Sequence, residues 1–243
     1  MLILRLAQHA ETQPDHYRVD IRLEGGDMPQ TPTAKFQFKL TGQDQEDLRW
    51  YLEDYLELHD ERDRQGRAQC LGQLGLVAYE RFKEARAATP TPSPRLRAAG
   101  KTSAGEGSAY SPASGEGGEL LKHLNDALGS YQQALALLPP NAVDDLAVTH
   151  NQLGNIYKNA DDLDHALPHY REAIRYSELG GDLYEAAKYR SNVALALMQA
   201  RRLDDAGEYA RAALRNYETY GERAAEEIQK TKGLIEGIES LNH

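Results

Sequence analysis

The pentapeptide Leu-Gly-Asn-Ile-Tyr at residues 153–157 decides the fold, because its order of small and large side chains returns along the chain. Three residues follow it at 12, 16 and 19 positions after its glycine: Ala166, Tyr170 and Ala173. The segment Val-Ala-Leu-Ala-Leu at residues 193–197 is followed at the same offsets by Ala206, Ala210 and Ala213. Recurrence at a fixed offset predicts stacked supersecondary units.

An earlier copy of this pattern is split. Residues 74–78 read Leu-Gly-Leu-Val-Ala, but the matching later residues, Ala127, Tyr131 and Ala134, begin 52 positions after Gly75. The inserted stretch 86–118 holds four Pro, six Gly, five Ser and three Thr and almost no large apolar residues. Such a composition cannot bury enough apolar surface to offset its chain entropy. We therefore expect a flexible linker at residues 89–118, between the two helices of one repeat.

These residues resemble the tetratricopeptide repeat, a helix-turn-helix unit of about 34 residues. The resemblance implies a short stack of helical hairpins, in which small residues let paired helices approach closely. The spacing from Gly154 to Ala194 is 40 residues, so we expect longer helices or longer connections. Pro168 falls in the second turn of a predicted helix and predicts a kink there. An apolar stripe in residues 222–241 predicts a helix that caps the stack.

The N-terminal region follows a different pattern. Residues 17–24 and 34–40 alternate apolar and polar side chains, and in residues 2–7 three leucines alternate with Ile3, Arg5 and Ala7. Such a period of two is typical of strands with one buried face. A helical pattern follows over residues 43–58. We therefore predict a mainly α protein in four parts: a small βββα unit at 1–59, the first helix of a split repeat at 60–88, the linker at 89–118 and the helical stack at 119–241.

The run Leu-Arg-Trp-Tyr-Leu-Glu-Asp-Tyr-Leu at residues 48–56 carries a second resemblance. It is similar to the N-terminal segment of bacterial proteins that join tetratricopeptide repeats to a caspase-like CHAT protease domain. We expect no such protease domain after the repeats of this chain. The resemblance implies an alternative function, in which the chain is a regulatory companion or remnant of a CHAT-type protease effector and acts on it in trans.

Composition excludes several function classes. The 243 residues carry a net charge of −10, which disfavours binding to nucleic acid and to anionic membranes. The single cysteine excludes an intrachain disulfide framework. The longest apolar runs are too short for a signal peptide or a membrane span. We expect a cytoplasmic protein.

Candidate catalytic and metal-binding residues are few. Cys70 lies in an apolar helical pattern, where a free cysteine usually packs as a small hydrophobic residue. His165 and His169 are four apart on a predicted helix, a spacing that can bind a metal ion. However, the residue after the first histidine is Ala166 and no third ligand is near in the sequence, so we expect a solvated helix face. We predict no catalytic residues, no metal site, no cofactor and no enzymatic activity.

The first helix of each repeat lines the concave surface of such a stack. The polar and apolar residues expected on that face are Asn151, Asn155, Lys158, Lys188, Ser191, Asn192 and Leu195. Asparagine side chains can hydrogen-bond the backbone of an extended peptide, and lysines can pair with its carboxylates. The repeat that contains residues 193–197 has Asn192 where some repeat proteins have a cation that holds a C-terminal carboxylate, so the full clamp is absent. The sequence thus predicts binding of a peptide or helix of another protein, against the alternative of an ordinary solvated face.

Overall fold

The computed structural model describes residues 64–88 and 118–242, the backbone of three short N-terminal strands, and the single positions 49, 50, 53 and 56. The chain divides into two compact units, Met1–His59 and Asp60–His243. In the described residues, no helix has the length and apolar character needed to cross a membrane.

The N-terminal unit contains an antiparallel sheet of order β1-β2-β3, formed by Leu2–Ala7, Tyr17–Leu23 and Ala34–Phe38. Leu4 pairs with Ile21, and Val19 pairs with Phe36. The predicted helix at residues 43–58, and with it most of the run that resembles CHAT-linked proteins, lies outside the described residues. The complete βββα unit and the alternative function based on that run therefore stay predictions.

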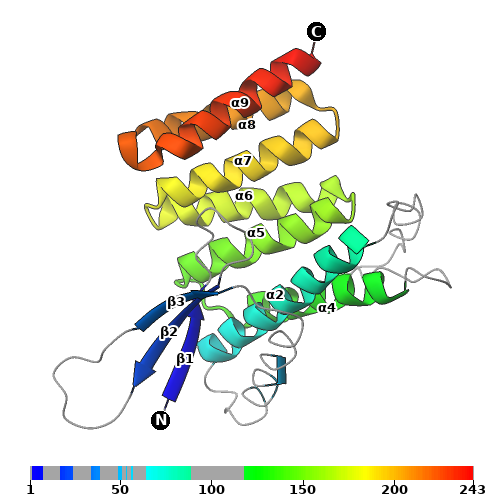
Figure 1. Ribbon diagram of the computed structural model, residues 1–243, viewed down its shortest axis with the longest axis vertical. Coiled ribbons are helices and arrows are strands. Elements are labelled where there is room, and N and C mark those ends of the chain that lie inside the picture. Colours follow the sequence, from blue (N-terminus) through cyan, green and yellow to red (C-terminus); the bar gives the residue numbers. More distant parts are fainter. Residues whose placement is uncertain are drawn as a thin grey trace. The chain divides into compact units, whose positions relative to one another are not determined.

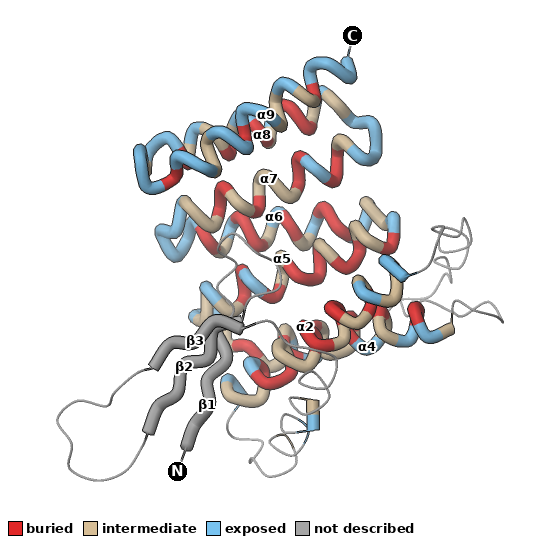
Figure 2. The backbone as a smooth tube through the Cα atoms, in the orientation of Figure 1, coloured by how far each residue is buried: buried red, intermediate tan, exposed pale blue. Residues whose placement is uncertain are grey.

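The second unit is a stack of antiparallel helical hairpins, as the repeat pattern predicts. Consecutive helices pair as α2–α4, α5–α6 and α7–α8, and α9 covers α8 (Figure 1). The bounds are α2 Arg64–Ala88, α4 Gly118–Leu137, α5 Val143–Asn159, α6 Leu163–Leu179, α7 Leu183–Gln199, α8 Leu203–Glu218, a 3₁₀ turn Gly221–Ala224 and α9 Ala225–Leu241. The closing helix thus begins with a 3₁₀ turn, and α6 continues past Pro168 to Leu179. Buried residues lie where neighbouring helices face each other, while most of α9 is exposed or half-buried (Figure 2).

The split repeat forms a hairpin. Helices α2 and α4 pack along each other although residues 89–117 separate them in sequence. A Cβ atom added to Gly75 would lie 2.8 Å from the Tyr131 ring, and one added to Gly154 would lie 2.7 Å from the Tyr170 ring. Each glycine therefore makes room for a tyrosine of the opposite helix. The same close approach recurs in the intact α5–α6 hairpin, which shows that both hairpins use one packing device.

Helix length accounts for the 40-residue period. Helices α5 to α8 begin at 20-residue intervals and are 16 or 17 residues long, with three-residue connections. The middle residue of each connection has a positive φ: 59° at Asp161, 78° at Gly181 and 60° at Arg201. This left-handed residue reverses the chain and lets the next backbone N–H bond back to the helix that has just ended. Asp162 N–H, for example, donates to the Tyr157 carbonyl at 2.9 Å.

Candidate functional site

The first helices of the three hairpins line one face of the stack. Helix α5 contacts both α2 and α7, although α4 and α6 intervene in sequence. Figure 1 shows these three helices following one another along the stack. Side chains on their shared face can therefore act together on one ligand, which is the arrangement expected for a groove.

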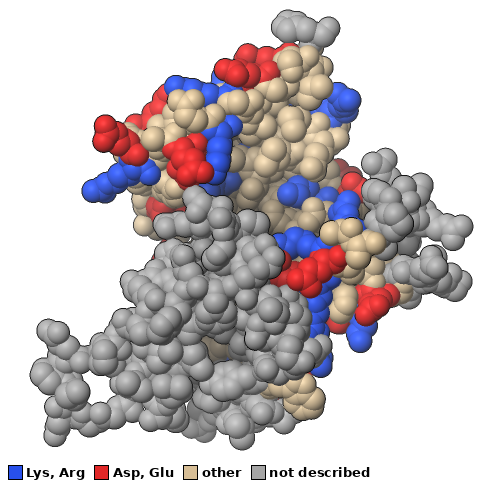
Figure 3. Space-filling model, viewed as in Figure 1, with Lys and Arg blue, Asp and Glu red and all other residues tan. Residues whose placement is uncertain are grey.

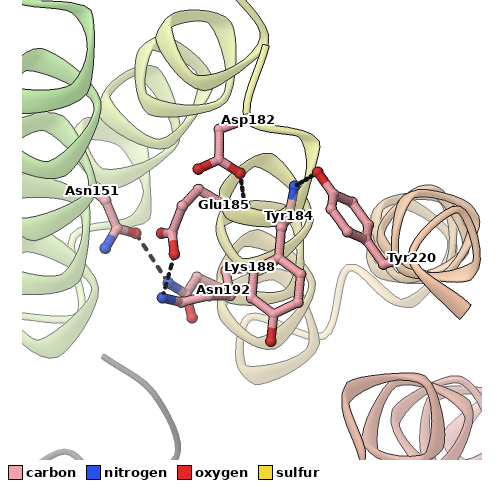
Figure 4. Close-up of polar contacts among 7 residues, drawn as sticks. All are labelled: Asn151, Asp182, Tyr184, Glu185, Lys188, Asn192 and Tyr220. Carbon is pink, nitrogen blue, oxygen red and sulfur yellow. Dashed lines mark hydrogen bonds and ion pairs between the residues drawn. The ribbon is translucent and has the colours of Figure 1, made fainter. Parts of the chain in front are cut away.

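Asn151 of α5 and Asn192 of α7 form the link between neighbouring repeats on this face. The Asn192 Nδ2 donates to Asn151 Oδ1 at 3.0 Å, and both residues are half-buried. In Figure 4, Asn151 reaches across from its helix toward Asn192. Beside them, the Lys188 Nζ donates to Glu185 at 2.8 Å. The structure thus brings three of the predicted groove residues close together.

Asn155 has a structural role instead. Its Oδ1 accepts a hydrogen bond from the Tyr170 hydroxyl at 2.8 Å, and its backbone carbonyl accepts one from the Tyr79 hydroxyl at 3.3 Å. The Tyr79 hydroxyl in turn accepts from Asn159 Nδ2. Burial raises the pKa of both tyrosines, so they act as neutral donors at all ordinary pH values. This network joins α2, α5 and α6. It occupies the Asn155 Oδ1 atom, which would otherwise accept a hydrogen bond from a ligand.

The remaining predicted residues on α7 differ in exposure. The Ser191 hydroxyl is buried beside Tyr217 of α8, so it faces the packing between α7 and α8. Leu195 is 37% exposed, and Val148, seven residues before Asn155 on α5, is 45% exposed. Leu195 and Val148 therefore add exposed apolar surface to α7 and α5.

A cavity of about 550 Å³ lies at the C-terminal ends of α2, α5 and α7. Its lining residues are Lys83, Arg86, Ala87, Lys158, Asn159, Asp161 and Gln199; we call it the basic pocket. It exists because α2 continues for 13 residues beyond Gly75, whereas α5 ends five residues beyond Gly154. The last turns of α2 therefore form a wall that the other hairpins lack.

Three cations meet in the basic pocket. Lys83 pairs with Glu80 at 2.7 Å, and the Arg86 guanidinium donates to the Asn159 carbonyl at 2.6 Å. Lys158 has no ion-pair partner in the part of the chain that the structure describes. Its pKa is lowered by burial and by the positive charges of Arg86 and Lys83. Figure 3 shows basic side chains gathered near the ends of α2 and α5 on this face.

Sequence reasoning found Lys158 but missed Lys83, Arg86, Asn159 and Gln199. Lys83 and Arg86 on α2 lie after residues 74–78, the last part of the repeat pattern before the insertion. The pattern resumes only at Ala127, so it assigns no role to these two cations. The helical pattern that continues to Ala88 was the available signal, since it extends α2 past the end that the repeat requires.

The candidate catalytic and metal-binding residues, Cys70, His165 and His169, lie in surroundings that do not form a reactive or metal-binding site. Cys70 is buried, and burial raises its pKa to about 12, which disfavours the reactive thiolate. His165 is exposed, as predicted, and its Nδ1 lies 2.8 Å from Asp162. His169 is not on a solvated face, because it is half-buried against His150. In the described residues no three histidine, cysteine or acidic side chains are grouped so that they could hold a metal ion.

No protein-family model and no curated protein matches this chain. Among solved structures, the chain is similar to the crystal structure of BtubC (BKLC) from P. vanneervenii, with 15% sequence identity and a TM-score of 0.38. The match covers 82% of this chain and 91% of that chain.

Proposed function

We propose that this chain is a non-catalytic interaction module of the tetratricopeptide type, which binds a peptide or helix of another protein along α2, α5 and α7. The observation that carries the proposal is the Asn192–Asn151 hydrogen bond between adjacent first helices. It holds two carboxamides at fixed positions on the shared face. Each keeps further donors and acceptors for the backbone of an extended segment.

The surroundings of this asparagine pair suit a mixed ligand. Val148 and Leu195 offer exposed apolar surface on the same two helices. Lys188, half-buried and paired with Glu185, can exchange that partner for a carboxylate of the ligand. Binding of this kind derives its specificity from a few exposed side chains rather than from the repeat pattern.

Site-specific photo-crosslinking tests the location of the ligand. A photoreactive amino acid is placed at Leu195 in the proposed groove, or at exposed Arg171 on α6 as the matched control. We expect one protein to crosslink from position 195 in native lysate and not from position 171. Asn151→Ala with Asn192→Ala should abolish that crosslink while the thermal unfolding curve stays cooperative.

Two results would contradict the proposal. Crosslinking of the same protein from both positions would show nonspecific contact. A crosslink from position 195 that survives the double alanine variant would show that the asparagine pair does not hold the ligand.

A further inference from the structure

We propose that the basic pocket is a binding site for a phosphoryl group, carried by a free phosphate ester or by a phosphorylated side chain. The site lies at the C-terminal ends of α2, α5 and α7, and it is distinct from the Asn151–Asn192 pair. The inference does not require the proposed partner segment, because it rests on the cations of the pocket alone.

The pocket is unusual for this chain in its charge. The whole sequence has 38 acidic and 28 basic residues, yet the lining of the pocket has three cations and one acid, Asp161. Like charges at short range repel each other, and partial burial increases the repulsion because water screens it less. Placing Lys83, Arg86 and Lys158 together therefore costs free energy, which a bound anion would recover.

Intramolecular contacts account for only part of this cluster. Arg86 donates to the carbonyl of Asn159 at the C-terminus of α5, where a cation is favourable. Lys83 pairs with Glu80 of its own helix. Neither contact includes Lys158, which lies in the last turn of α5. The helix dipole favours a cation there, but Arg86 and Lys83 both disfavour the charged form of Lys158.

The donors favour a phosphoryl group over a single carboxylate. Lys83 and Arg86 approach from α2 and Lys158 from α5, so three charged donors surround the cavity from two helices. A carboxylate offers two oxygens and one negative charge. A phosphoryl group offers three oxygens and a charge of about −1.5 to −2 at pH 7, and one oxygen can face each cation. The cavity of about 550 Å³ admits a phosphate ester with its attached group.

Isothermal titration of the full chain with inorganic pyrophosphate tests the site, at constant ionic strength. We expect binding to the wild type, and a loss of about tenfold in affinity for Lys158→Gln, since one charge-assisted hydrogen bond is removed. Lys83→Gln should show a similar loss, and Lys158→Arg should retain most of the affinity. The matched controls are Lys122→Gln on α4 and Lys232→Gln on α9, which remove exposed lysines outside the pocket. Thermal melts confirm that each variant is folded.

Further titrations separate the sources of the ligand. A phosphoserine peptide that binds more tightly than pyrophosphate, while its unphosphorylated form does not bind, supports a phosphorylated side chain. Equal affinity for phosphoserine and for inorganic phosphate supports a small ester. Malonate binding as tightly as pyrophosphate, equal losses in all lysine-to-glutamine variants, or no binding to the wild type would each overturn the proposal.

Discussion

The Nδ1 atoms of His150 on α5 and His169 on α6 lie 3.0 Å apart. At this distance the two nitrogens are hydrogen-bonded, so one N–H must lie between them. The ring centroids are 5.2 Å apart. Tyr176 stacks beside His150, and Tyr157 stacks beside His169. This arrangement accommodates one shared proton and disfavours two charged imidazoles.

Stability should therefore fall in mild acid. The pKa of His169 is lowered to about 4 by burial and by the neighbouring His150 and His165, and Glu172 opposes this shift. The pKa of His150 is also lowered by burial, with Glu172 opposing and Arg175 adding to the shift. Because the unfolded chain binds protons near pH 6.5 and the folded chain does not, stability is complete above that pH and decreases from there toward pH 4.

Urea denaturation at pH 7.0 and pH 5.0 measures this loss. We expect His169→Asn to remove about 1–2 kcal/mol of the pH-dependent change in unfolding free energy, after allowance for solvent screening. His123→Asn is the comparison on a different hairpin: burial and Arg81 lower the pKa of His123, so this variant should remove a contribution of the same sign but leave that of the His150–His169 pair intact. An unchanged pH dependence in His169→Asn would show that His169 binds its proton as readily in the folded chain as in the unfolded chain.

Gly154 and Tyr170 should be energetically coupled. An added Cβ at Gly154 would lie 2.7 Å from the ring of Tyr170, which is fully buried. We expect Gly154→Ala to destabilise the protein by about 1–3 kcal/mol through overpacking, and Tyr170→Ala by about 3–5 kcal/mol through a cavity. The double variant reproduces the Ala194 and Ala210 pair of the third hairpin, where both alanines are buried.

A double-mutant cycle checks this coupling by urea denaturation. The combined change in unfolding free energy should be smaller than the sum of the single changes by about 1 kcal/mol or more. If the two changes in unfolding free energy were strictly additive, the small residue at position 154 would not be needed to accommodate the Tyr170 ring.

The three-residue connections between α5, α6, α7 and α8 allow a separate prediction about backbone strain. Gly181 and Arg201 occupy the same place, with φ of 78° and 60°. Nothing lies within 4 Å of a Cβ built on Gly181, so a side chain there meets backbone strain alone. We expect Gly181→Ala to destabilise by about 1 kcal/mol and Arg201→Gly to stabilise by a few tenths to about 1 kcal/mol. Thermal unfolding of both variants checks the opposite signs, and the same sign for both would contradict the assignment.

The hairpin stack was predictable because the small and large residues that close helix packing requires recur at fixed offsets in the sequence. Gly154 and Tyr170 recur as Gly75 and Tyr131 despite the insertion, since close helix packing requires a small residue opposite a large one. Three-residue connections followed less directly, because Arg201 at a positive φ has no sequence signature comparable to that of Gly181. The N-terminal strands follow from period-two alternation in the same way.

The site was only partly predictable. Asn151 and Asn192 lie at helical positions that the repeat places on one face, so their proximity could be expected. Asn155 lies on the same predicted face, but the hydroxyls of Tyr170 and Tyr79 on other helices donate hydrogen bonds to it. The basic pocket depends on how far α2 extends past the repeat, and the His150–His169 pair depends on the register between α5 and α6. Neither relationship has a fixed sequence spacing.

The packing of α2 on α4 predicts that the split repeat survives a cut between its halves. Phe82 on α2 and Leu124 on α4 are fully buried, and Gly75 receives the Tyr131 ring. A site for a sequence-specific protease is inserted after Gly100, and cleavage is followed by size-exclusion chromatography. We expect the fragments 1–100 and 101–243 to elute together, because the apolar contacts of the hairpin do not depend on the connecting residues. Phe82→Asp places an unpaired charge in this contact and should release the fragments after cleavage. Separation of the wild-type fragments would show that the covalent connection, and not the hairpin contact, holds α2 on the stack.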